Sequence, residues 1–178
     1  MEAQTHPTRG QIEIFRAADA GELLETMRIA PMDAEQMQGL TRLVEADYSS
    51  GFVVKVLFSS EALGVSLTYS WFKPGFPLPR HCHDADCLYY IISGELTYGA
   101  ETLLAGDSML VPAGALYTFE TGEGGVEFVE FRQAASYDID YRSSPKAWAR
   151  QLEQTRARAP SWQAAEPPLA ARRMTAAN

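Results

Sequence analysis

The stretch GFPLPRHCHDADCLYYIISG, residues 75–94, is the most informative part of this 178-residue sequence. It begins at Gly75, places His81 and His83 one residue apart, and ends at Gly94. In an extended segment, residues i and i+2 point to the same face, so the two imidazoles can share one ion. The pattern therefore predicts a metal site, although a His-x-His pair also arises by chance.

The residues around this stretch are typical of an all-β domain. Gly64–Phe72 alternates, with Val65, Leu67, Tyr69 and Trp71 on one side, which predicts a strand whose apolar side faces a core. Short segments punctuated by Gly or Pro follow at spacings of about ten residues, which favours an antiparallel sandwich or barrel. These predicted strands are Cys87–Ile92, Glu95–Tyr98, Glu101–Leu104, Ser108–Val111, Leu116–Thr121 and Val126–Arg132.

Helices are expected only outside this region. Helical spacing of apolar residues predicts a helix over Asp33–Asp47, and Ser144-Pro145 opens a second helix to about Arg158. We expect a short strand at Ile12–Phe15 and a frayed Ala- and Pro-rich end over the last twenty residues. The predicted organisation is an arm with one helix (1–50), a β-barrel (51–134), and a helix with a basic flexible tail (135–178).

Charge and composition exclude several classes of protein. The net charge of −8 argues against nucleic-acid binding. Residues 1–141 hold 8 basic and 21 acidic residues, whereas residues 142–178 hold 7 and 2, so a basic tail could dock on an acidic body. No signal-peptide pattern and no membrane-spanning apolar run of about 18 residues is visible. With two cysteines five positions apart, we expect a soluble cytoplasmic protein without disulfides.

A second motif, GDSMLVPAGALY at residues 106–117, completes a resemblance to the cupin superfamily. The first cupin motif is Gly, five residues, His-x-His, three or four residues, Glu, six residues, Gly. The second is Gly, five residues, Pro-x-Gly, two residues, His. Both motifs keep the family's spacing in this sequence, and the resemblance covers about residues 52–132. The resemblance implies a jelly-roll barrel (a double-stranded β-helix) with an N-terminal helical arm and a C-terminal helix, and a homodimer formed through residues 11–58.

Two positions depart from the family pattern: Cys87 stands where the resemblance expects a Glu ligand, and Tyr117 where it expects a third His. One hypothesis is that His81, His83 and Cys87 bind a divalent transition metal (zinc, iron, copper or nickel), completed by Tyr117 or water. In a second, the histidines bind with Asp84 or Asp86. In a third, the metal is lost and the barrel is a small-molecule pocket.

The functional expectation follows from these alternatives. The leading interpretation is a metal-dependent enzyme of dioxygenase, lyase or isomerase type that acts on a small apolar or aromatic molecule. In this interpretation Tyr117 donates or accepts a proton during the reaction. The alternatives are a non-catalytic binding or sensing barrel and a protein-interaction module. Glu127 and Glu130 differ in strand parity, so only one of them can face inward as the missing carboxylate. The residues expected to line the cavity are Tyr69, Trp71, Tyr89 and Phe119.

Overall fold

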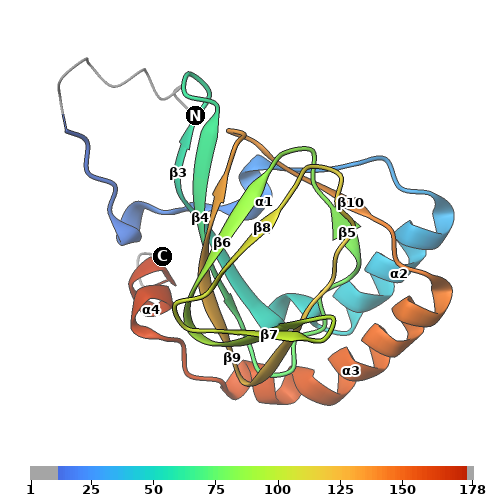
Figure 1. The fold of residues 1–178 in the computed structure, drawn as a ribbon. Helices are drawn as coiled ribbons and strands as arrows, with labels where there is room; N and C mark the ends of the chain where they lie inside the picture. Colours follow the sequence, from blue (N-terminus) through green and yellow to red (C-terminus); the bar gives the residue numbers. More distant parts are fainter. Residues whose placement is uncertain (1–11, 176–178) are drawn as a thin grey trace.

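The computed structural model describes residues 12–175, so His6 lies outside the described residues. Long strands curve round a common centre, α2 and α3 lie together on one side, and α4 lies on another side beside the N-terminal segment (Figure 1). No helix within residues 12–175 has the length and apolar character needed to cross a membrane.

The strands are β1 (Gly21–Glu22), β2 (Met27–Ile29), β3 (Phe52–Ser60), β4 (Val65–Phe72), β5 (His81–Cys82), β6 (Cys87–Tyr98), β7 (Glu101–Leu104), β8 (Ser108–Val111), β9 (Glu120–Arg132) and β10 (Tyr137–Tyr141). The helices are α1 (Leu23–Thr26), α2 (Ala34–Glu45), α3 (Pro145–Ala164) and α4 (Leu169–Thr175), with 3-10 turns η1 (Ala17–Asp19) and η2 (Tyr48–Gly51). Ile12–Phe15, predicted to be a strand, forms none.

The larger sheet has the order β1-β3-β4-β9-β6-β7, with β8 also paired to β6, and its pairs are antiparallel. A smaller sheet has the order β2-β10-β5, in which β2 runs parallel to β10. The sheet is not closed into a continuous barrel. This mostly antiparallel jelly roll confirms the predicted all-β fold class.

The predicted strands on either side of Gly94 and around Gly122–Gly125 are joined into two long strands, β6 and β9. Gly94 has a φ of 75°, and a Cβ there would lie 2.1 Å from the carbonyl oxygen of Gly125. Gly125 has a φ of 73° itself. The glycines that read as chain breaks are therefore places where two continuous strands bend and pass each other closely.

The apolar side of β4 does not face the interior of the jelly roll, which corrects the placement of two predicted cavity residues. Tyr69 and Trp71 pack with Ala171 and Met174 of α4, in a second buried cluster outside the sheet. The alternate residues of β4 face inward, opposite Phe128 and the other inward residues of β9. Strand parity separated the two faces correctly, but the sequence pattern did not reveal that α4 covers the outer one.

The predicted helices are present, and the second is longer than expected. Asp33 caps α2 by accepting from the backbone N–H of Gln36 at 2.8 Å. Ser144 caps α3, which continues through Pro160 to Ala164. Instead of a frayed end, the chain up to residue 175 forms α4 and buries Met174, because the outer face of β4 gives it an apolar surface to cover.

The basic segment lies against the body, where α3 buries Trp148 and Trp162 in the main core and also forms two exposed ion pairs. Arg158 of α3 contacts Glu123 at 3.0 Å, and Arg150 contacts Glu120 at 3.5 Å. Both carboxylates belong to β9, in the acidic part of the sequence. These exposed pairs orient α3 and add little stability, since surface ion pairs contribute about 0–1 kcal/mol each.

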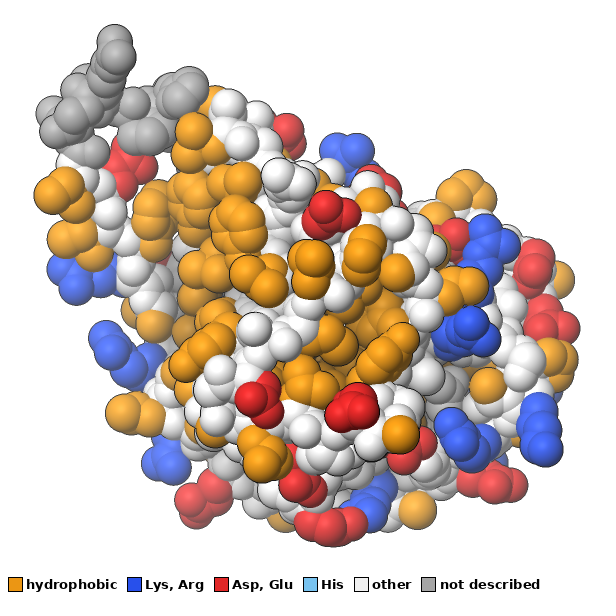
Figure 2. Space-filling view, in the orientation of Figure 1, with side chains coloured by type: hydrophobic (Ala, Val, Ile, Leu, Met, Phe, Trp, Pro, Cys, Tyr) orange, Lys and Arg blue, Asp and Glu red, His pale blue; other side chains and the backbone are white. Residues whose placement is uncertain are grey.

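Hydrophobic side chains gather over β6 and β8 on the face seen in Figure 2. Contiguous apolar surface of this kind often marks an interaction site. The predicted homodimer stays a prediction, and this face is available to it alongside the exposed apolar residues of the N-terminal arm. The exposed residues of this face are Leu88, Tyr90, Ile92, Leu110 and Phe131.

Candidate functional site

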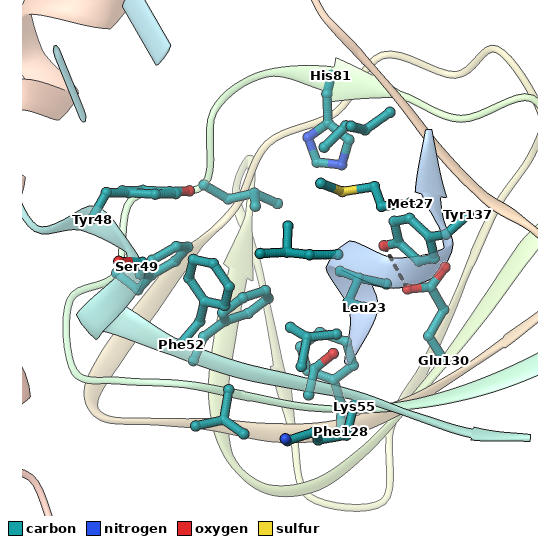
Figure 3. Close-up of a pocket in the computed structure, with 18 of the residues that line it drawn as sticks. Leu23, Met27, Tyr48, Ser49, Phe52, Lys55, His81, Phe128, Glu130 and Tyr137 are labelled. Carbon is teal, nitrogen blue, oxygen red and sulfur yellow. Dashed lines mark hydrogen bonds between the residues drawn. The ribbon is translucent and has the colours of Figure 1, made fainter. Parts of the chain in front are cut away.

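A cavity of about 380 Å³ lies inside the jelly roll. Leu23 and Met27 from the N-terminal segment, Tyr48 from η2 and Phe52 from β3 line one part of it (Figure 3). His81 lies at another part of its wall. Its lining is mainly aromatic and aliphatic, as is usual for sites that take small organic molecules. The inner wall includes Phe72, Phe76, Leu78, Tyr89, Tyr117, Phe119, Phe128, Glu130, Tyr137, Ile139 and Tyr141.

Three of the predicted site residues meet beside this cavity, and two of them, His81 and Tyr117, line it. The Nε2 atoms of His81 and His83 are 3.2 Å apart. The hydroxyl oxygen of Tyr117 is 3.0 Å from Nε2 of His81 and 3.1 Å from Nε2 of His83. All three side chains are buried. The predicted convergence of the two imidazoles is therefore present, with the Tyr117 phenol as the third corner of a small triangle.

Backbone contacts fix which ring nitrogens carry hydrogen. Nδ1 of His81 lies 2.7 Å from the carbonyl oxygen of Pro79, and Nδ1 of His83 lies 2.5 Å from that of Asp138. A carbonyl oxygen can only accept, so both Nδ1 atoms donate. In a neutral imidazole the other nitrogen then carries a lone pair. Two lone pairs therefore point at one place in the interior.

Both imidazoles are held neutral by their surroundings. Burial lowers the pKa of His81 to about 4, and the positive charge of Arg132 adds to this effect. Burial lowers the pKa of His83 to about 2, helped by His81 and Arg132. Near pH 7 neither ring carries a proton on Nε2.

Tyr117 cannot satisfy both nitrogens. It has one hydroxyl hydrogen, and its oxygen lies 2.6 Å from the hydroxyl oxygen of Tyr89. If Tyr89 donates to Tyr117, then Tyr117 donates to one imidazole and the Nε2 of the other keeps an unshared lone pair. Burial raises the pKa of both phenols, and the charge of Glu130 raises it further. The phenols therefore stay protonated near neutral pH.

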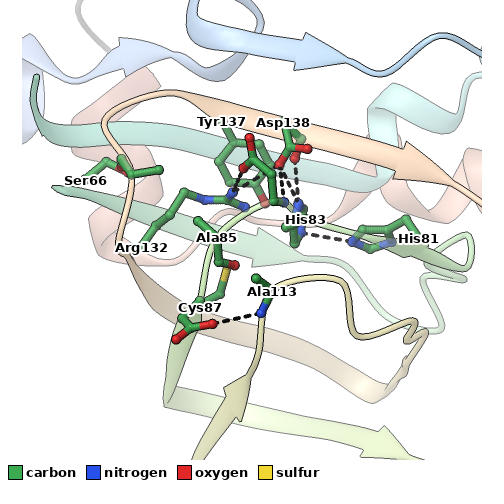
Figure 4. A network of polar contacts seen from close by, with 12 residues as sticks. Ser66, His81, His83, Ala85, Cys87, Ala113, Arg132, Tyr137 and Asp138 are labelled. Atoms are coloured by element: carbon green, nitrogen blue, oxygen red, sulfur yellow. Dashed lines mark hydrogen bonds and ion pairs between the residues drawn. The ribbon is translucent and has the colours of Figure 1, made fainter. Parts of the chain in front are cut away.

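Cys87 is buried, but it is not assembled with the histidines. Its thiol donates to the carbonyl oxygen of Ala85 at 3.3 Å (Figure 4). Burial raises its pKa, and the nearby charge of Glu130 raises it further, so the thiolate is disfavoured. Across residues 12–175, no three His, Cys, Asp or Glu side chains form a group arranged to hold a metal ion. Both cysteines are free thiols, and Cys82 is only partly buried.

The two aspartates considered as substitute ligands have other partners. Asp86 accepts from the backbone N–H of Ala113 at 2.8 Å. Asp84 is exposed and lies 3.9 Å from Arg132. Neither carboxylate is positioned by these contacts as a third ligand beside the imidazoles.

Glu130 is the buried carboxylate of the cavity, and Glu127 faces the opposite side of β9. Glu130 accepts from Arg132 at 3.2 Å and from the Tyr137 hydroxyl at 3.1 Å. Glu127 accepts from Tyr69 at 2.8 Å and from Ser93 at 3.0 Å, outside the jelly roll. Strand alternation predicted that the two glutamates face opposite sides of β9, but it did not indicate which of them lines the cavity.

Arg132 was not singled out from the sequence. Its side chain is fully buried, and its guanidinium lies 3.4 Å from Asp138 and 3.9 Å from the centre of the Tyr137 ring. A buried arginine on a strand that otherwise reads as core has no signal in a single sequence. Its partners Asp138 and Tyr137 lie on β10, beyond the loop that follows β9.

The two sequence motifs meet in space through the backbone. His81 and Tyr117 form an antiparallel bridge, in which each N–H donates to the other's carbonyl oxygen, at 3.1 and 3.0 Å. The first-motif and second-motif residues are thereby placed side by side in the interior of a jelly roll.

The chain has the cupin fold. Solved structures similar to it include an RmlC-like cupin from Shewanella frigidimarina (24% identity, TM-score 0.43, covering 48% of this chain and 78% of that chain). Another is the polyketide cyclase RemF from Streptomyces resistomycificus (17% identity, TM-score 0.48, 59% and 84%). A third is the DMSP lyase DddQ from Ruegeria pomeroyi (20% identity, TM-score 0.44, 49% and 49%). No protein-family model and no curated protein matches the sequence.

Proposed function

We propose that this cupin is a metal-dependent enzyme that acts on a small apolar or aromatic molecule. One observation carries the proposal: two neutral, buried imidazoles direct their Nε2 atoms at one point, 3.2 Å apart, and one of them, His81, lines a largely apolar cavity. Without a shared cation, this arrangement leaves a buried acceptor without a donor, which costs about 1–3 kcal/mol.

The donor set fits a divalent transition metal ion. The Nε2 atoms of His81 and His83, the two proposed protein ligands, are 3.2 Å apart. Neighbouring ligands with bonds of about 2.0–2.1 Å, in tetrahedral or octahedral angles, lie about 2.9–3.4 Å apart. Each imidazole also donates Nδ1–H to a carbonyl oxygen, an arrangement that fixes the ligand tautomer. Imidazole suits zinc, iron, copper and nickel, and Cys87 is left out of the proposed ligand set.

The residues around the two histidines can position substrate and hold a proton. When bound, the ion would supply Lewis acidity to a substrate oxygen. Tyr117 stays protonated and can donate to an oxygen beside the imidazoles, while Tyr89 lies behind it as the next donor. The aromatic wall excludes water and orients an apolar substrate. This chemistry supports an oxygenase, lyase or isomerase reaction.

Metal analysis tests the proposal. Protein purified without chelator should contain close to one transition metal ion per chain, and His81→Ala and His83→Ala should each lose it. Cys87→Ser is the matched control, because it alters a buried residue of the first motif that lies outside the proposed ligand set. Wild-type protein that takes up no zinc, iron, copper or nickel would overturn the proposal, and so would metal content unaffected by both histidine variants.

A second candidate is a binding or sensing barrel without metal. It is favoured by the lack, within residues 12–175, of a third His, Cys, Asp or Glu beside the two histidines. In that case a small molecule should bind equally well to chelator-treated protein and to untreated protein, and no metal should be found in either.

A further inference from the structure

Glu130 is placed to contact whatever occupies the cavity. Its carboxylate is buried and belongs to the cavity lining, where Figure 3 shows it beside Tyr137. Glu130 projects from β9 and lies opposite Tyr89 of β6 and Thr68 of β4 in the sheet. The lining contains one other carboxylate, Glu22, whose side chain is half exposed and paired with Lys55.

The Glu130 carboxylate is held rigidly but is not saturated. One oxygen accepts from Arg132 and the other from Tyr137, at 3.2 and 3.1 Å. An ionised carboxylate offers about four acceptor positions, so acceptor capacity remains for a ligand. Arg132 is also held by Asp138 at 3.4 Å, so its charge is shared between two carboxylates. A fixed, charged acceptor therefore lies in a wall that is otherwise mostly apolar.

Without the proposed metal ion, no described side chain of the cavity lining offers an unpaired cation that would hold an anionic ligand. Lys55 is the one lysine or arginine among the residues that line it, and Lys55 is paired with Glu22. Arg132 is fully buried behind Glu130 and is not part of the lining. A ligand carboxylate would be desolvated close to the negative charge of Glu130, which is unfavourable.

The wall beside Glu130 is aromatic, since Phe128 lies two residues before Glu130 on the same face of β9. Phe72, Phe119 and Phe128 surround the interior with ring centroids 5.5–6.2 Å apart. Aromatic side chains at these separations offer both faces and edges for an aromatic ligand.

We propose that Glu130 makes this cavity selective for uncharged aromatic molecules that carry a hydroxyl group, which donates its hydrogen to the Glu130 carboxylate. This inference rests on the proposed function for the identity of the site and defines the class of its substrate. Glu130 is a specificity-determining residue in this scheme. The ligand hydroxyl donates a hydrogen bond to the charged carboxylate, and the ligand ring packs against the aromatic side chains of the wall.

Binding of three probes of similar shape tests this: 1-naphthol, naphthalene and 1-naphthoate, by equilibrium dialysis against chelator-treated protein. In the wild type, 1-naphthol should bind at least about tenfold more tightly than naphthalene, because hydrogen bonds to charged groups contribute that much. 1-Naphthoate should bind more weakly than 1-naphthol by about 100-fold or more. Comparable binding of 1-naphthol and 1-naphthoate would overturn the proposal.

Two matched variants assign the selectivity to Glu130. Glu130→Gln should reduce the preference for 1-naphthol over naphthalene to about threefold or less. Glu127→Gln changes another buried glutamate, on the other face of the same strand, and should leave the preference unchanged. Equal effects of the two variants, or no effect of Glu130→Gln, would contradict the assignment. Glu130→Asp keeps a carboxylate for Arg132, but its shorter side chain moves that carboxylate away from the cavity. It should therefore also weaken the preference for 1-naphthol over naphthalene. It replaces Glu130→Gln if that variant does not fold.

These measurements separate the inference from the proposed function. The probes are compared without metal, whereas the proposed function is tested by metal content. Selective 1-naphthol binding by a protein that takes up no metal would leave the role of Glu130 standing and refute the metal-dependent enzyme. A metal-loaded protein without 1-naphthol selectivity would do the opposite.

Discussion

Acid should destabilise this protein through its two buried histidines more than through any ordinary histidine. In the unfolded chain both imidazoles have the usual pKa of 6.5, whereas in the folded protein the pKa of His81 is about 4 and that of His83 about 2. Between pH 6.5 and the folded values, the unfolded chain therefore binds more protons. Stability from these groups is fully present above pH 6.5 and is lost as the pH falls through that window.

The magnitude follows from the shifts. At pH 4.5, which lies two pH units below the unfolded pKa, each histidine contributes a loss of roughly 3 kcal/mol relative to pH 8. The two together give about 5 kcal/mol as an order of magnitude, which is comparable to the whole stability of many domains. The loss approaches a constant value for His81 below pH 4 and continues for His83 to lower pH.

Urea unfolding at pH 4.5, 5.5, 6.5 and 7.5, with chelator present, measures this loss. The double variant His81→Gln/His83→Gln keeps every carboxylate and removes both imidazoles, so it serves as the reference. Above pH 7 the two proteins should differ by a constant free energy, and below pH 6.5 the wild type should lose up to about 5 kcal/mol more. Parallel curves over the whole range would show that the imidazoles are solvated, and the tautomer argument for the metal site would fail with them.

Three further predictions follow from the same contacts. Zinc affinity, measured by calorimetric titration, should change less than about twofold between pH 7.5 and 5.5, because neither imidazole takes up a proton in that range. A site made of two histidines with ordinary pKa values would lose about 100-fold in zinc affinity over the same range. Gly94→Ala should cost about 3 kcal/mol or more of unfolding free energy, since its Cβ would lie 2.1 Å from the Gly125 carbonyl oxygen. The control Gly99→Ala, at a φ of 62° in open space, should cost about 1–2 kcal/mol. Equal losses in the two variants would argue against the close crossing of β6 and β9. Arg132→Met should lower the free energy of unfolding by about 3–5 kcal/mol, because it leaves Glu130 buried without its cation. The control is Arg80→Met, which changes an exposed arginine. A loss below about 1 kcal/mol for Arg132→Met, similar to that of the control, would show that Glu130 is not charged.

The sequence predicted the fold class and the centre of the candidate site through local patterns. Alternation and turn residues gave the strands, and motif spacing put His81, His83 and Tyr117 on one site, which the backbone bridge between His81 and Tyr117 makes possible. The starts of the two helices at Asp33 and Ser144 were also predicted, because a helix start depends on residues only three positions apart.

Other features depended on contacts between distant segments. The sequence separated the faces of β4 and β9 by parity, since successive side chains alternate, but parity does not say which face is inside. Which face of β4 lies inside is decided by α4, which lies far along the chain from β4. Helix α4 covers Tyr69 and Trp71, and the other face of β4 is left to line the cavity. The same assembly turned Glu130 inward and Glu127 outward, and held Glu130 against Arg132 and Tyr137. Local periodicity therefore determined the strands and the pair of imidazoles, whereas the polarity of the cavity was decided by which surfaces the distant helices and strands came to bury.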